Sequence, residues 1–151
     1  MKFEKFLKQT GTHGQIYTRD NGDKWLICAG VGMRIPMGVE NLLGSGEVSE
    51  KVKALVEGLI NADTDDRVVL TRAQITADGK ASDIIRVFGD KLDIEVGIYN
   101  AAFGLLEKAD VNLAEVEIEA VDNGYMDETK FLLILDRDNE VIGFIEGVRD
   151  I

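Results

Sequence analysis

One cysteine and one histidine are the only residues of this chain that could pair as a thiol nucleophile and its base. They are Cys28 and His13, and a hairpin between them could bring them together. A reactive thiol needs a lowered pKa, and no neighbouring cation supplies one for Cys28. Cys28 lies in an apolar run, where cysteine packs as a small hydrophobic side chain. The sequence therefore predicts no catalytic residue, and it has too few nitrogen and sulfur ligands for a zinc site.

Two glycine-rich stretches could suggest a phosphate-binding loop. Residues 30–32 read Gly-Val-Gly after a predicted strand, but Ile35 occupies the third glycine position of a dinucleotide-binding turn. Residues 44–46 precede a predicted helix, whose amides could bind an anion. Glu47 and Glu50 lie at that helix end and would repel phosphate, and no Gly-Lys-Ser/Thr follows. We therefore expect no nucleotide and no other cofactor.

Acidic residues gather at three places, in residues 20–23, 63–66 and 136–140. Two of these groups resemble the opening of an EF-hand loop, but each lacks the glycine and the final glutamate that such a loop needs. Aspartate and asparagine side chains bind their own backbone in turns. The sequence therefore predicts three turns and no metal ligands, with a weak, adventitious calcium site as the alternative.

Composition excludes several classes of protein. The chain has 151 residues and a formal charge of −11, which disfavours binding to nucleic acid and to anionic lipid surfaces. No run of apolar residues is long enough to cross a membrane, and the first residues lack the apolar core of a secretory signal. A single cysteine forms no intramolecular disulfide, which favours a reducing compartment.

Hydrophobic periodicity predicts most of the elements. Residues 3–8 and 50–60 have apolar residues at helical spacing, and Ser49 is a good N-cap for the second helix. An Asn-Gly turn predicts a hairpin of residues 15–19 and 24–29. The other predicted elements are strands at 67–76 and 113–121, a turn at 77–80, a short helix from Ser82 to Gly89, and a hairpin of 131–135 and 141–145. A helix is also predicted at 98–109, whereas residues 92–98 could be helix or strand.

Strands that follow one another in local hairpins favour an α+β fold. We expect a single α+β domain spanning residues 1–151, with a largely antiparallel sheet and two to three helices packed on one face. Residues 30–46 have neither helical nor strand periodicity, and they are predicted to form an irregular apolar loop or arm.

Residues 30–46 contain the candidate interaction segment. Methionine adapts its shape to a partner, and contiguous exposed apolar surface marks partner sites. The alternative is that the segment folds back over the core. The candidate interaction residues are Met33, Arg34, Ile35, Met37, Val39, Leu42 and Leu43.

Residues 10–14, residues 25–36 and residues 41–44 together resemble small proteins of tailed bacteriophages and of prophages of gut Firmicutes that are associated with virion structure. The resemblance covers roughly the first third of the chain and assigns no role to any residue. It implies a head or tail component that works in assembly, in the virion or in the cytoplasm of a bacterial host. Its partners would be further copies of itself or other phage structural proteins.

The leading hypothesis is thus a non-enzymatic structural or assembly protein that acts through protein–protein contacts. One alternative is a small-molecule-binding module or an unrecognised enzyme. A second alternative is an acidic regulator that covers a basic partner surface through Glu115, Glu117 and Glu119, which alternate along a predicted strand with one solvent-exposed face.

Overall fold

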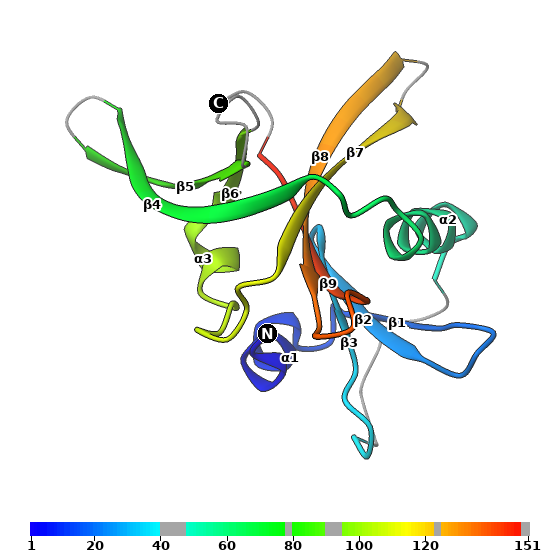
Figure 1. Cartoon of the computed structure of the whole chain (residues 1–151). Helices are drawn as coiled ribbons and strands as arrows, with labels where there is room; N and C mark the ends of the chain where they lie inside the picture. Colours follow the sequence, from blue (N-terminus) through cyan, green and yellow to red (C-terminus); the bar gives the residue numbers. More distant parts are fainter. Residues whose placement is uncertain (40–47, 78–79, 90–94, 123–124, 149–151) are drawn as a thin grey trace.

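The computed structural model describes residues 1–39, 48–77, 80–89, 95–122 and 125–148 (Figure 1). These residues form three helices and nine strands. In chain order the elements are α1 (Phe3–Thr10), β1 (Gln15–Thr18), β2 (Lys24–Cys28), β3 (Val31–Arg34), α2 (Glu50–Ile60), β4 (Arg67–Ala77), β5 (Lys80–Gly89), β6 (Glu95–Tyr99), α3 (Asn100–Phe103), β7 (Leu113–Asp122), β8 (Tyr125–Leu135) and β9 (Val141–Glu146).

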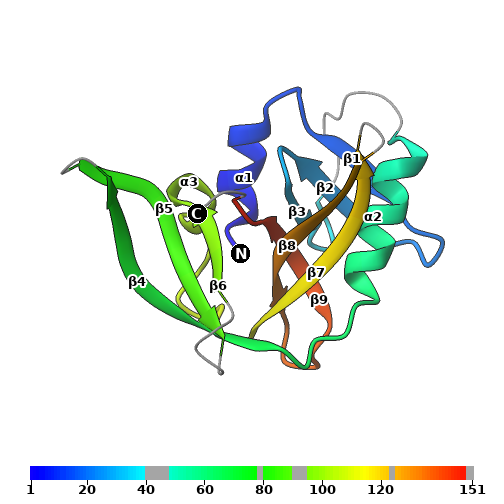
Figure 2. The same ribbon diagram turned by 90° about the horizontal axis from the view of Figure 1, so that it is seen from above.

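The nine strands make one antiparallel sheet in the order β1-β2-β3-β9-β8-β7-β4-β5-β6. The sheet curls, so that β4, β5 and β6 face β7, β8 and β9 (Figure 2). The chain after β9 links the two sides, because Val148 N donates to the carbonyl of Gly97 in β6 at 2.7 Å. The prediction of an α+β fold with a largely antiparallel sheet is confirmed.

β8 shows that the central sheet is buried on both faces. Its residues 131–135 are all apolar and all buried. The two even-numbered side chains belong to one apolar cluster with Phe6 of α1, and the three odd-numbered ones belong to another with Val56 and Leu59 of α2. α1 and α2 therefore cover opposite faces, whereas the sequence predicted helices on one face. A strand without alternation of apolar and polar residues needs a cover on each side.

Several local predictions are confirmed. α1 and the hairpin of β1 and β2 lie where the periodicity placed them. Ser49 caps α2, because its Oγ accepts a hydrogen bond from the backbone of Val52 at 3.2 Å. The three acidic groups form turns, as the acceptor side chains of Asn21, Asp63 and Asp136 each bind a backbone N–H two residues on, at 2.9–3.0 Å.

Two helix predictions are wrong. The segment from Ser82 to Gly89 lies in strand β5, which pairs with both β4 and β6. The segment 98–109 begins in strand β6 and contains only the short helix α3. Short apolar runs fit either period, and here the pairing of Ile85 with Ile98 decides for strand. Residues 78–79 of the predicted turn lie outside the described residues.

The prediction of an irregular loop over residues 30–46 is wrong in its first part. Val31–Arg34 is strand β3, which lies between β2 and β9. Gly32 weakens the sequence pattern that would indicate a strand. The structure needs a glycine there, because the ring of Phe144 from β9 packs where a side chain at position 32 would lie. Residues 40–47 lie outside the described residues.

Candidate interaction surface

The chain leaves the sheet after β3 and forms a protruding turn, which we call the arm (residues 36–39; Figure 1). Ile35 N donates to the carbonyl of Lys24 at 2.8 Å and holds the base of the arm against β2. Val39 N then donates to the carbonyl of Pro36 at 3.3 Å. Gly38 has φ 87°, the positive value that a type II turn needs at its third residue. Met37 therefore lies at the corner of the turn.

The candidate interaction residues divide into an inner and an outer group. Met33 and Ile35 are 1% and 8% exposed, and both belong to the core under the sheet. Met37 is fully exposed and Val39 is 37% exposed. The buried pair cannot contact a partner in this fold, so the described apolar contact surface reduces to the arm. Leu42 and Leu43 lie outside the described residues.

Arg34 connects the base of the arm to the turn between β8 and β9. Its guanidinium lies 3.8 Å from Asp136 Oδ2 and 3.7 Å from Glu140 Oε2. Both ion pairs are longer than a good hydrogen bond and partly solvated, so each contributes little to stability. Arg34 is thus only loosely tied to this turn, and its guanidinium stays partly solvated.

Apolar side chains flank the arm where it meets the first residues of the chain. A hollow of about 550 Å³ is lined by Pro36 and Val39 from the arm and by Phe3 and Leu7 from α1, among others. Phe3 and Leu7 are only partly buried. Charged residues, Lys2, Glu4, Lys5 and Glu107, also line this hollow, and Met37 is not part of its lining. The apolar surface around Met37 is therefore limited to the arm itself.

A second apolar hollow, which we call the groove, lies where α1, α3 and the turn between β2 and β3 meet. It has a volume of about 330 Å³, and its lining contains no charged residue. Tyr99, at its rim, is 57% exposed. Half-buried Cys28 lines the groove, whereas His13 is exposed and does not line it. The described hydrogen bonds include none between Cys28 and His13, so the geometry gives no support to a thiol–base pair.

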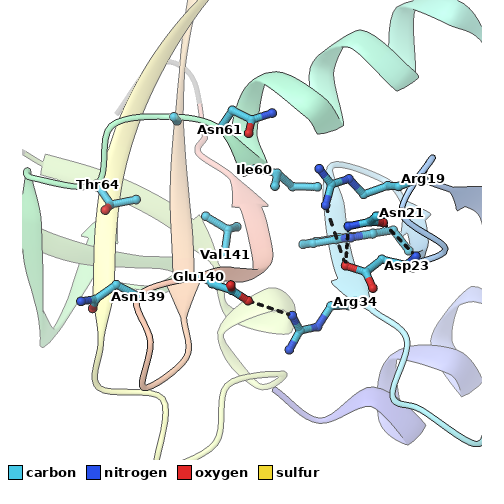
Figure 3. Close-up of a pocket in the computed structure, with 12 residues that line it drawn as sticks. Arg19, Asn21, Asp23, Arg34, Ile60, Asn61, Thr64, Asn139, Glu140 and Val141 are labelled. Carbon is cyan, nitrogen blue, oxygen red and sulfur yellow. Dashed lines mark hydrogen bonds and ion pairs between the residues drawn. The ribbon is translucent and has the colours of Figure 1, made fainter.

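A polar pocket of about 340 Å³ lies between α2 and the β1–β2 and β8–β9 turns (Figure 3). Arg34 points toward Glu140 on one side of it, and Arg19 lies beside Asp23 on the other. Trp25 lines the pocket, and its buried indole Nε1 has no hydrogen-bond partner. Buried donors are normally paired, so this N–H is a reason to ask whether the pocket takes a ligand.

Glu57 fastens α2 to the first hairpin beside this pocket. Its Oε1 accepts hydrogen bonds from Tyr17 Oη at 2.8 Å and Arg19 Nε at 2.9 Å, and its Oε2 accepts one from Arg19 at 3.2 Å. The bonds from Arg19 and then Tyr17 lower the pKa of Glu57. The same carboxylate raises the pKa of Tyr17, since a hydrogen-bonded phenol keeps its proton.

The network around Glu57 predicts a pH-dependent stability. The folded pKa of Glu57 is depressed, so its contribution is complete above the ordinary glutamate pKa of about 4.3 and is lost as the pH falls through the folded pKa. We expect Glu57→Gln to lower the free energy of unfolding at pH 7 by about 1 kcal/mol, a modest value because the site is partly solvated. Urea unfolding at pH 7 and pH 3 would show a smaller difference between variant and parent at pH 3. An equal difference at both pH values would contradict this assignment.

The predicted acidic face of β7 is only partly exposed. Ala114, Val116 and Ile118 pack in the cluster under α2, as the alternation predicted. Glu115 is 7% exposed, lies 3.6 Å from Lys130 Nζ, and leaves Oε2 without a hydrogen-bond partner. Its burial raises its pKa despite the nearby Lys130.

The expectation that Glu115 faces solvent is therefore wrong, because its side chain is buried beside Lys130 of the neighbouring strand β8. Glu117 is exposed, and a hydrogen bond to Glu128 raises its pKa. The side chain of Glu119 lies outside the described part of the chain. The acidic face offered to a partner is thus smaller than the sequence suggested.

Comparison with known proteins gives no relative. No protein-family model matches the chain, and neither a curated protein nor a solved structure matches it. Among the described residues, no group of three or more His, Cys, Asp or Glu residues is arranged to hold a metal ion. The described helices include none with the length and apolar character needed to cross a membrane. The arm and the groove must therefore be interpreted from their own geometry.

Sequence reasoning included the arm in a longer predicted loop, residues 30–46, but it missed the groove. The groove is lined by residues from three segments that are far apart in the chain, near positions 6–10, 28–31 and 99–105. Each segment taken alone is an ordinary apolar stretch. Only the packing of α1 beside α3 brings them together, so no local signal could have marked this site.

Proposed function

We propose that this chain is a non-enzymatic structural or assembly protein that acts through protein–protein contacts, as a head or tail component of a tailed phage or prophage. The observation that carries the assembly part is the fully exposed Met37 at the corner of the turn closed by Gly38. The phage part rests on the resemblance of the first third of the chain to such proteins.

An exposed methionine at the tip of a turn is available to pack against a partner. Burying its side chain on a partner would gain about 1.5–3 kcal/mol, and its flexible thioether adapts to an imperfect fit. The hydrogen bond from Val39 N to the carbonyl of Pro36 closes the turn, which lowers the conformational entropy that the backbone loses on binding. The net charge of −11 opposes contact elsewhere on the surface, which favours association through the uncharged arm.

The overall shape also supports assembly. The β4–β5 and β7–β8 hairpins extend away from the body of the molecule on either side (Figure 1). Their strands include Arg67–Ala77 and Tyr125–Leu135, each of 11 residues. Extended hairpins enlarge the surface that a small protein presents to neighbours. In this proposal the protein works in the virion or in the host cytoplasm before assembly.

Met37→Asp should weaken self-association or association with a partner by at least about tenfold, because it places a charge where the proposed contact is apolar. Light scattering after size exclusion, over a wide range of concentration, would measure this. Val111→Asp is the matched control, since Val111 is 76% exposed and is not part of the arm. Both variants should unfold at the parental temperature. Equal association of parent, Met37→Asp and Val111→Asp would refute the proposal.

A small-molecule-binding module is the second candidate, and the polar pocket favours it. The unpartnered indole N–H of Trp25 and the long ion pairs of Arg34 leave donors beside a cavity of about 340 Å³. A ligand that binds only the folded state raises the melting temperature. In a thermal-shift panel of metabolites, a hit that disappears in Arg34→Ala would support this function. A panel without any shift would count against it.

A further inference from the structure

The arm and the groove lie at opposite ends of the same part of the fold. The arm follows Arg34 at the end of β3, whereas Val31 at the start of β3 lines the groove. α1 runs between the same two places, with Phe3 beside the arm and Thr10 beside the groove. Three residue steps along β3 separate its ends by about 10 Å, and the arm points away from the sheet. A chain therefore does not fill its own groove with its own arm.

The two surfaces match in charge and chemistry. The arm reads Pro-Met-Gly-Val, and the lining of the groove contains no charged residue, in a chain of which 30% of the residues are charged. Two copies of a protein with a charge of −11 repel one another, and that repulsion is weakest where both surfaces are uncharged. The residues of the arm and those that line the groove carry no charge that would lose its hydration when they meet.

The groove also suits a methionine side chain. A hollow of about 330 Å³ is at the lower end of the size of small-molecule sites, so one long side chain and its turn can enter it. The rings of Phe6 and Tyr99 line it, and methionine sulfur packs favourably against aromatic rings. Tyr99, now 57% exposed, would become covered.

We propose that the arm of one copy inserts Met37 into the groove of the next copy, so that the chain assembles head to tail. This inference rests on the proposed assembly function and names the partner as a second copy of the chain. A contact between two different surfaces is heterologous, so each copy keeps one free arm and one free groove. Repetition then gives a closed ring or an open filament. The contact is small, and each single step is therefore weak.

The single cysteine allows a direct test, because Cys28 lines the groove. A variant with Met37→Cys and Cys28→Ser carries its only thiol on the arm. It is mixed with the parent protein, which carries its only thiol in the groove, and a short bismaleimide is added. With a mass tag on one protein, head-to-tail docking is expected to give mixed dimers several-fold in excess of either homodimer.

A matched control moves the thiol to another exposed apolar position. The variant with Val111→Cys and Cys28→Ser has a comparably accessible thiol outside the arm, and it should give few mixed dimers. Ala101→Glu, at the exposed rim of the groove, should reduce both the cross-link and the association. Melting temperatures would verify that each variant is folded.

The outcomes separate this inference from the broader function. If Met37→Asp weakens association but mixed dimers do not exceed the Val111→Cys control, the arm docks elsewhere and only the head-to-tail inference is overturned. A dominant homodimer through the arm thiol, with no effect of Ala101→Glu, would show a symmetric contact and would also overturn it. If neither Met37→Asp nor Ala101→Glu changes association, both proposals fail.

Discussion

Gly32→Ala is expected to lower the free energy of unfolding by about 3 kcal/mol. An added Cβ at Gly32 would lie 2.2 Å from Cε1 and 2.3 Å from Cζ of Phe144. The ring cannot simply move aside, because it stacks on Trp25 with centroids 5.9 Å apart and meets Phe131 edge-on at 6.1 Å. The variant must therefore displace either β3 or a group of three packed aromatic rings. Urea unfolding followed by tryptophan fluorescence would measure the loss, since Trp25 is part of that group.

A second glycine provides a control of opposite sign. Gly58 lies within α2, and an added Cβ would meet only Ile118 Cδ1, at 4.0 Å. Gly58→Ala should therefore raise the free energy of unfolding by roughly 0.5–1 kcal/mol, because alanine loses less backbone entropy in a helix. If Gly32→Ala left the free energy of unfolding unchanged or raised it, as Gly58→Ala should, the close approach of Phe144 to β3 would be wrong.

Leu59→Ala is expected to cost about 3 kcal/mol of unfolding free energy, within the usual range for a buried leucine. Leu59 is fully buried and, with Val56, anchors α2 on the second apolar cluster. Its removal leaves a cavity between the helix and the sheet that rigid strands cannot fill. The midpoint of urea unfolding should fall while its slope stays unchanged, since the loss is of stability alone.

Leu55→Ala is the matched control, because Leu55 belongs to the same helix but is only half-buried. Its loss should be roughly 1 kcal/mol, in proportion to the smaller apolar area that it removes from water. Equal losses at the two positions would mean that α2 does not cover the sheet face in the way described. A clear excess for Leu59 would confirm that the sheet has a core on each side.

The sequence by itself determined the elements whose signals are local. The Asn-Gly turn specified the first hairpin, and Ser49 with the apolar stripe after it specified α2. The alternation in β7 correctly placed Ala114 and Val116 on the core side. In each case, the residues that carry the signal are also the residues that form the contact, so no distant partner was needed to interpret them.

Tertiary structure alone decided the elements that depend on distant partners. β5 and β6 contain short apolar runs that fit helix or strand, and only their pairing with each other and with β4 fixes them as strands. β3 is evident only in the structure, where the ring of Phe144 occupies the space that a side chain at position 32 would need. Glu115 was expected to face solvent, but it is buried beside Lys130 of β8.

The candidate site divides in the same way. The sequence identified the segment that contains the arm, because in residues 33–43 only Arg34 and Glu40 are charged, which stands out in an acidic chain. It could not distinguish Met33, which packs in the core, from Met37, which is exposed, since that depends on where β3 ends and the turn begins. The groove was decided by tertiary structure alone, because packing joins three distant segments, and local patterns hold no information on which segments meet.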